Sequence, residues 1–435
     1  MQIANITNPF YKFIKTCNET WIDIDNIPRT SKDHIFGTCT FFDEYWKDEN
    51  ELNNEIPTIF IISIDGIGSR ELYKIWEKYH LTNTTLIPDF IAKHKNPIIL
   101  FDNSAEGHCD EDMLKFISQV VDMYKLNPNT TFYGNSAINI KEIHQRTEYT
   151  NFRTLYTANF QEDTMSELYE QLSNLEVAYE GKGKLYSCLN NAPKPHRALL
   201  LGALDIGNNM VSTPSVDFQE LQSQTIKYLI DQSERQQISA EDVNDGISYL
   251  KDLQLIYPLE LDKRNDDIIH MKQLSADNSF ISDLLDCDLQ LITETFSDNT
   301  LVITEKIYKA IIMKQPFIIF GPHRIYKFLQ SKGYKTFEHL ITTNTWKGSS
   351  NYDSTTNIIT KIKFLIQQLE TLSMLKENPI KWQEIEQQNK LDAEHNFDLF
   401  THNMHSIRES STQGLDAWLS NYEDFNLLFN VDLDK

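Results

Sequence analysis

Short apolar runs alternate with longer amphipathic stretches along the 435 residues of the chain. The runs are rich in Ile and Phe and are bounded by turn residues, as buried strands of a parallel sheet are. Between them, apolar residues recur at the three- and four-residue spacing of helices that bury one face. We therefore predict strands at 58–64, 97–101, 131–133, 185–189, 289–292 and 316–320, and helices at 70–79, 112–124, 196–204, 218–230, 305–313 and 324–332.

Strands that alternate with helices predict βαβ units and hence a doubly wound α/β architecture. The best candidate for a linker is the segment EGKGK at 180–184, which holds two glycines and no apolar residue. A new strand and helix begin directly after it. We therefore predict an N-terminal α/β domain at 1–182, a C-terminal α/β domain at 183–375 and a C-terminal helical segment at 376–435, set apart by Pro379.

Composition narrows the class of protein. Hydrophobic residues make up 40% and aromatic residues 11% of the chain, which is ample for a core and excludes disorder along its whole length. A net charge of −23 disfavours nucleic acid and anionic lipid as partners. No apolar run reaches the ~18 residues of a membrane span, and no signal peptide is apparent. The five cysteines are scattered and odd in number, which favours a reducing, cytoplasmic location.

The segment 293–321 carries the clearest candidate chemistry. Thr304 can cap a helix that begins near Glu305, and the helix would bury the stripe Ile307, Ala310 and Ile311. Lys306 then lies in the first turn, where the helix dipole disfavours a cation. An anion bound between Lys306 and the free N–H groups would explain it, and Glu305 could accept hydrogen bonds from a sugar diol. From spacing alone, an ordinary surface helix start is the commoner interpretation.

A second segment, 185–204, reads as a strand, a polar loop and a helix. Its loop places Lys194, His196 and Arg197 at the start of the helix, where backbone N–H groups also point outward. These groups could form a clamp for a diphosphate, because arginine can bind phosphate oxygens through two parallel hydrogen bonds. The alternative is that Arg197 pairs with one of the many surface carboxylates.

Several segments occur in a fixed order along the C-terminal half. They are Glu294-Thr295-Phe296, the T-E-K run at 304–306, the strand P-F-I-I-F-G at 316–321 and the block L-Q-S-K-G-Y-K-T-F at 329–337. T-E-K followed by an apolar strand and G-P resembles the donor-binding segment of α1,3-fucosyltransferases. The full order is still closer to a wider group of viral and bacterial glycosyltransferase-like proteins. That group also has a segment similar to the one around Asn190 and Arg197.

The resemblance implies a GT-B fold, in which two Rossmann-like domains face a cleft and C-terminal helices pack back across the domains. It implies transfer of a sugar from a nucleotide-sugar donor to a hydroxyl acceptor of unknown kind, a glycan or a protein, with inversion. By the same resemblance, Glu305 would bind the donor's ribose and Lys306 and Arg197 its diphosphate. The other donor-binding residues would be Asn190, His196, Glu294 and Thr304.

The general base is expected among acids that follow strands of the N-terminal domain. Glu106 is the first choice and Asp102 the second, while for either residue a capping role in a solvated loop is the plainer alternative. D-x-D strings occur, as chance predicts for so acidic a chain, and no zinc motif or P-loop is present, so neither a metal nor a cofactor is predicted. The alternative function is a glycosyltransferase-like protein that binds a ligand without turnover.

Overall fold

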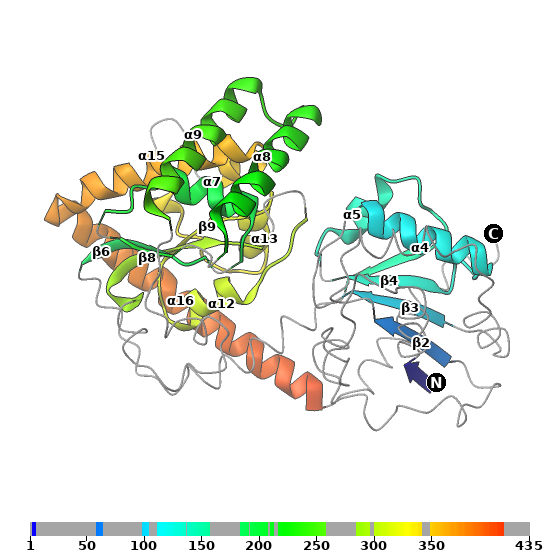
Figure 1. The fold of residues 1–435 in the computed structure, drawn as a ribbon. Coiled ribbons are helices and arrows are strands. Elements are labelled where there is room, and N and C mark those ends of the chain that lie inside the picture. The colour runs from blue at the N-terminus through cyan, green and yellow to red at the C-terminus, as the bar shows by residue number, and fades with distance from the viewer. Residues whose placement is uncertain are drawn as a thin grey trace. The chain divides into compact units, whose positions relative to one another are not determined.

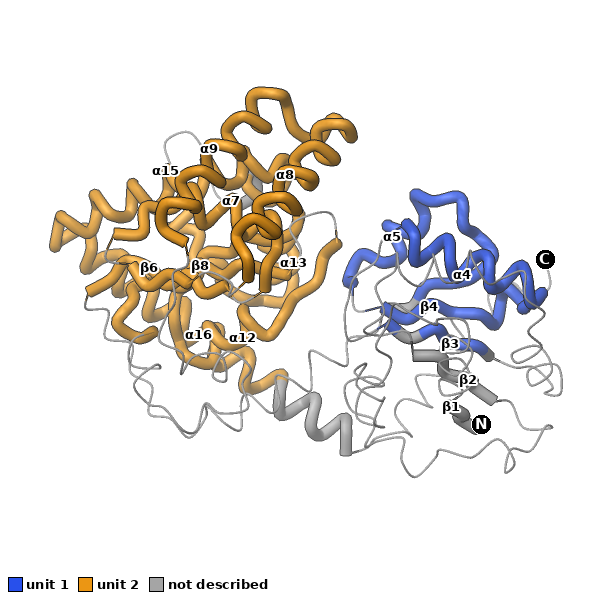
Figure 2. Tube along the Cα trace, in the orientation of Figure 1, with its two compact units in different colours: residues 1–164, 405–435 blue, residues 165–404 orange. Residues whose placement is uncertain are grey.

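The structure is a computed structural model that describes residues 2–5, 58–63, 98–103, 111–135, 137–156, 183–190, 192–207, 209–212, 216–257, 284–295, 300–341 and 349–412. The chain divides into two compact units, one of residues 1–164 and 405–435 and one of residues 165–404 (Figure 2). Both contain parallel sheets and helices, so the predicted α/β class is confirmed. The boundary predicted at 182 stays a prediction, because residues 157–182 lie outside the described ranges.

Unit 1 contains a five-stranded parallel sheet in which the strands follow one another in chain order (Figure 1). Its helix α4 (Glu111–Tyr124) buries an apolar stripe that includes Leu114, Ile117 and Val121. A shorter helix, α5 (Ile140–Gln145), precedes the last strand. The strands are β1 (Gln2–Asn5), β2 (Thr58–Ser63), β3 (Ile98–Asn103), β4 (Thr131–Asn135) and β5 (Arg153–Tyr156).

Unit 2 contains a four-stranded parallel sheet of order β7-β6-β8-β9. Its strands are β6 (Lys184–Cys188), β7 (Met210–Val211), β8 (Cys287–Thr293) and β9 (Phe317–Phe320). Helices α7 (Pro195–Ala203), α8 (Phe218–Glu234), α9 (Ala240–Ile256) and α15 (Ile358–Lys376) lie on one face, and α12 (Glu305–Ile312) and α16 (Pro379–Thr412) on the other (Figure 1). The remaining elements are α13 (Ile325–Ser331), the 3-10 helix η5 (Glu338–Leu340) and α14 (Ser349–Ser354).

The strand order of unit 2 creates a topological switch point between β6 and β8. From β6 the chain runs through α7 to β7 on one side, and the later strands β8 and β9 lie on the other side. The helices that follow β6 and β8, namely α7 and α12, lie on opposite faces of the sheet (Figure 1). In open α/β sheets, ligands bind in the crevice that such a divergence leaves.

All six predicted strands are present, and five of the predicted helices are present with ends within a few residues of the prediction. The sixth, at 70–79, lies outside the described ranges. The pattern missed β1, β5 and β7, which are two to four residues long. It also missed α5 and α9, although Ser239 and Asp242 form a capping box at the start of α9.

The block at 329–337 is accounted for by packing. Gly333 has a φ of +89°, which favours glycine, and reverses the chain after α13. The Phe337 ring then packs edge-on against that of Phe317 in β9, with centroids 4.9 Å apart. The side chain of Asn396 in α16 accepts from the N–H of Lys335 at 2.7 Å and donates to its carbonyl at 2.8 Å. This block therefore packs between β9 and α16.

The D-x-D string at 286–288 is also structural. Asp288 in β8 is 1% exposed and forms an ion pair with Lys376 of α15, with Nζ and Oδ2 2.5 Å apart. The same ammonium donates to the carbonyl of Gly183 at 3.1 Å. Burial raises the pKa of Asp288, and Lys376 opposes that shift. The ion pair connects the C-terminal end of α15 with the amino-terminal end of β8.

Candidate functional site

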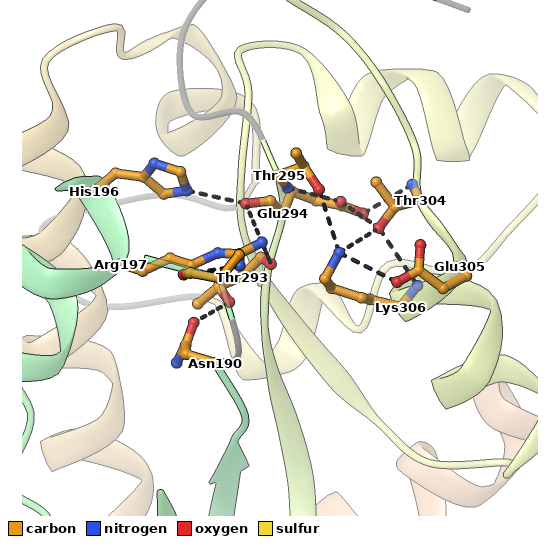
Figure 3. A network of polar contacts seen from close by, with 10 residues as sticks. Asn190, His196, Arg197, Thr293, Glu294, Thr295, Thr304, Glu305 and Lys306 are labelled. Atoms are coloured by element: carbon orange, nitrogen blue, oxygen red, sulfur yellow. Dashed lines mark hydrogen bonds and ion pairs between the residues drawn. The ribbon is translucent and has the colours of Figure 1, made fainter. Parts of the chain in front are cut away.

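The candidate site lies at the carboxyl ends of β6 and β8, where α7 and α12 begin. Asn190 follows β6 and Glu294 follows β8, while Arg197 lies in the first turn of α7 and Thr304 caps α12. The structure thus brings together two segments that are far apart in the sequence (Figure 3). All seven predicted donor-binding residues lie in this cluster: Asn190, His196, Arg197, Glu294, Thr304, Glu305 and Lys306.

The first turn of α12 has the predicted cap. The Thr304 hydroxyl accepts from the N–H of Lys306 at 3.5 Å, and the helix buries Ile307, Ala310 and Ile311 as expected. The Lys306 ammonium donates to Thr304 Oγ1 at 3.1 Å and to Thr295 Oγ1 at 3.4 Å. It also lies 3.4 Å from Glu305 Oε1, and about a quarter of each of these two side chains is exposed. Both charged groups are therefore accessible to a ligand.

The charge of Glu305 is stabilised by its neighbours. Burial alone would raise the pKa of this carboxyl, but the charges of Lys306 and Lys309 and the hydrogen bonds to the carboxylate together outweigh burial, so that the pKa falls below its ordinary value. Glu305 is therefore ionised at neutral pH. An ionised carboxylate only accepts hydrogen bonds, which suits it to bind hydroxyl groups.

Glu294 is fully buried between the end of β8 and the start of α12. Its Oε1 accepts from the N–H of Thr304 at 3.2 Å, and its Oε2 accepts from the Thr304 hydroxyl at 2.6 Å and the N–H of Thr295 at 3.3 Å. Burial raises the pKa of Glu294, while Lys306 and the bonds from Thr304 lower it. Both carboxylate oxygens are thus engaged inside the protein.

Arg197 is 3% exposed, and its hydrogen bonds go to backbone carbonyls rather than to a surface carboxylate. Its two terminal nitrogens reach the carbonyl oxygens of Ala192 at 3.4 Å, Thr293 at 3.3 Å and Glu294 at 3.3 Å. Its Nε is buried without a partner in the described part of the chain. Burial lowers the pKa of Arg197, and the carboxylates of Glu294 and Glu305 oppose this. A buried N–H without an acceptor calls for an explanation, and a bound anion is one that suits a cationic group.

His196 and Asn190 support the site from within the protein. Burial and the charge of Arg197 lower the pKa of His196 to about 3, so the ring is neutral, and its Nε2 bonds the Glu294 carbonyl at 3.0 Å. The side chain of Asn190 accepts from the Thr293 hydroxyl at 2.6 Å. Thr293 and Thr295 were not predicted as site residues, although both lie beside Glu294 and their hydroxyls bond other residues of the cluster.

The candidate bases belong to unit 1. Glu106 lies outside the described residues. Asp102 is the penultimate residue of β3, near the carboxyl end of that strand, and pairs in register with Ser63 and Gly134. The part of Asp102 that the structure describes is its backbone, so its role stays a prediction.

A cavity of about 580 Å³ lies at the opposite side of the sheet of unit 2, beside the amino-terminal ends of β6 and β7. Its lining includes Tyr186, Asp205, Asn209 and Lys376. Its polar groups bond one another: the Tyr186 hydroxyl donates to the Asp205 carbonyl at 2.7 Å, and Asn209 accepts from the N–H of Tyr186 at 3.2 Å. By contrast, Arg197 Nε has no hydrogen-bond partner in the described part of the chain. We therefore prefer the cluster at the carboxyl ends of β6 and β8 to this cavity as the candidate site.

Comparison with known proteins adds no relative: no family model, no curated protein and no solved structure matches the chain. Among the described residues, no helix is long and apolar enough to cross a membrane. Within the same ranges, no group of three His, Cys, Asp or Glu side chains is arranged to hold a metal ion.

Proposed function

We propose that the protein is a glycosyltransferase of the GT-B type, which moves a sugar from a nucleotide-sugar to a hydroxyl acceptor. The observation that carries the proposal is the convergence of Arg197 and Lys306, with the N-termini of α7 and α12, at one switch point. Helix N-termini and side-chain cations together favour a bound diphosphate. The order of motifs from Glu294 to Phe337, which resembles that of glycosyltransferases, supports the same function.

In the proposed reaction, the bond between the anomeric carbon and the diphosphate oxygen breaks, and the acceptor oxygen attacks that carbon from the opposite side. The bond electrons leave with the nucleoside diphosphate, and the acceptor proton passes to the base. Lys306 and Arg197 stabilise the charge that develops on the leaving group. Glu305, which is ionised and partly exposed, accepts hydrogen bonds from the ribose hydroxyls.

Ligand binding is the first test of this function. We expect one of GDP, UDP, CDP or ADP to stabilise the protein against thermal unfolding by about 2.7 kcal/mol at 100 times its Kd. Adenosine and inorganic sulfate are the controls, because neither contains a diphosphate. If none of the four nucleotides stabilises the chain more than these controls do, the proposal is wrong.

Turnover separates an enzyme from a protein that only binds. Slow hydrolysis of the matching nucleotide-sugar in the absence of acceptor is expected of a transferase. Tight nucleotide binding with no hydrolysis and no transfer to any offered glycan or protein would instead favour the non-catalytic alternative.

The base is tested once an acceptor is known. Glu106→Gln keeps size and polarity but removes basicity, so transfer should fall by ~10²–10⁴-fold while nucleotide affinity persists. Glu111→Gln, which removes the same charge from an exposed position at the start of α4, is the control. Near-normal transfer by the Glu106 variant would move the role to Asp102.

A further inference from the structure

Glu294 occupies an unusual position, because its backbone and its side chain bond two different helix N-termini. Its carbonyl oxygen is held by His196 Nε2 at 3.0 Å and by a terminal nitrogen of Arg197 at 3.3 Å, both from the first turn of α7. Its carboxylate bonds the N–H and the hydroxyl of Thr304, the cap of α12. Figure 3 shows these contacts on either side of one residue.

The hydrogen bonds around Thr304 have a fixed direction. The Thr304 hydroxyl accepts from the N–H and from the ammonium of Lys306, so its single proton must go to Glu294. The same carboxylate also receives the N–H groups of Thr304 and Thr295. A group that receives three donors must act as an acceptor only, which a carboxylate does and an amide does not. The position of the Lys306 ammonium therefore depends on Glu294 through Thr304.

We propose that Glu294 is the positioning residue of the candidate site, which holds the first turns of α7 and α12 together so that Arg197 and Lys306 face one ligand. Glu294 itself is fully buried and acts through its neighbours rather than by contact with the ligand. The inference rests on the proposed function, since the ligand is taken to be a diphosphate.

Gly321 shows that the structure makes room for this residue. A Cβ at position 321 would lie 3.1 Å from Cβ and 3.2 Å from Cγ of Glu294, closer than ordinary van der Waals contact. The backbone also bonds here, because the N–H of Glu294 donates to the Phe320 carbonyl at 2.9 Å. Glycine is therefore favoured at position 321, because a larger residue would clash with the Glu294 side chain.

Burial of the Glu294 carboxylate lowers the stability of the folded chain, which favours a functional role for this residue. Burial raises the pKa of Glu294, which means that its ionised form is less favourable in the folded chain than in water. An apolar residue of similar volume at a buried charged site is often neutral or stabilising. A charged group that the fold holds at such a cost is typical of sites where activity takes precedence over stability.

Hydrogen exchange measured by mass spectrometry tests the positioning role without any ligand. In Glu294→Gln, the amides of Thr295, Thr304 and Lys306 should exchange about tenfold faster, because the first two donate to the Glu294 carboxylate and the third donates to the Thr304 hydroxyl that this carboxylate holds. Asp288→Asn is the matched control, since it removes a buried carboxylate near the first residue of β8, the strand that Glu294 follows. Unchanged exchange of these three amides in Glu294→Gln, or the same change in the control, would overturn the inference.

Ligand affinity then connects position to binding. Inorganic pyrophosphate and the best nucleoside diphosphate, titrated calorimetrically, should bind Glu294→Gln at least tenfold more weakly than wild type. Thr304→Val removes the hydroxyl link and should have a similar effect, whereas Thr304→Ser should restore affinity. The double variant Glu294→Gln/Thr304→Val should bind no more weakly than the worse single variant, because both act through one bond.

The possible results separate the two proposals. If wild type binds no diphosphate but exchange near α12 rises in Glu294→Gln, the proposed function is wrong and the structural link stands. If exchange rises and diphosphate affinity does not change, Glu294 has no positioning role in binding. Should Glu294→Gln fail to fold, the Thr304→Val and Thr304→Ser pair decides: equal diphosphate affinity in the two variants would refute the inference.

Discussion

Replacement of Lys306 by methionine is the most direct test of the candidate site. Lys306→Met keeps the length of the side chain and removes the ammonium that lies beside Glu305 and Thr304. A phosphate oxygen at ~4 Å from this charge would be attracted by about 4 kcal/mol at an effective dielectric constant of ~20. Glu305, 3.4 Å away, and the solvent around the exposed quarter of the side chain both reduce that attraction.

The net effect should therefore match a charged hydrogen bond, about 1.5–3 kcal/mol. This corresponds to a Kd about 10- to 150-fold higher for a nucleoside diphosphate, measured by isothermal titration calorimetry. Part of the loss should disappear at high salt, because a partly exposed charge is screened. Lys251→Met, at an exposed position of α9, is the control for net charge. If both variants bind with the wild-type Kd, Lys306 does not bind the diphosphate.

Three further predictions concern stability. Lys376→Met removes the ammonium that pairs with the buried Asp288 carboxylate, so the free energy of unfolding, measured in urea, should fall by about 3 kcal/mol; a loss below ~0.5 kcal/mol would contradict a structural role for the pair. Gly333→Ala places a Cβ at a φ of +89° and 3.2 Å from a Leu399 methyl, so the melting temperature should fall by an amount equivalent to ~1–2 kcal/mol, and an unchanged value would contradict the strain. Burial raises the pKa of Glu294, so the stability that this carboxyl contributes is fully present below the pKa of the unfolded chain and is lost as pH rises through the folded pKa. The stability of Glu294→Gln relative to that of wild type should therefore rise as pH increases above about 4.5, the ordinary pKa of a glutamate, and a difference that does not vary with pH would refute this assignment.

The helix α12 shows what local sequence determines in this protein. The cap at Thr304 and the buried stripe of this helix follow from local rules, so the sequence predicts them directly. The strands β2, β3, β6, β8 and β9 are apolar runs that local pattern also identifies. By contrast, β7 has two residues, too few for any pattern, and its place beside β6 depends on pairing.

What only tertiary structure decides is which side chains meet. Asn190 and Thr293 are 103 residues apart and bond each other because β6 and β8 pair in the sheet. The sequence by itself indicated that Arg197 and Lys306 belong to one site, since both cations lie where a predicted strand leads into a helix, and the resemblance to glycosyltransferases added Glu294. It could not show that Arg197 bonds backbone carbonyls and that Glu294 bonds two helix N-termini, because burial and direction arise from parallel pairing and helix packing. Local sequence thus determined the elements and their caps, and the order of the strands determined the site.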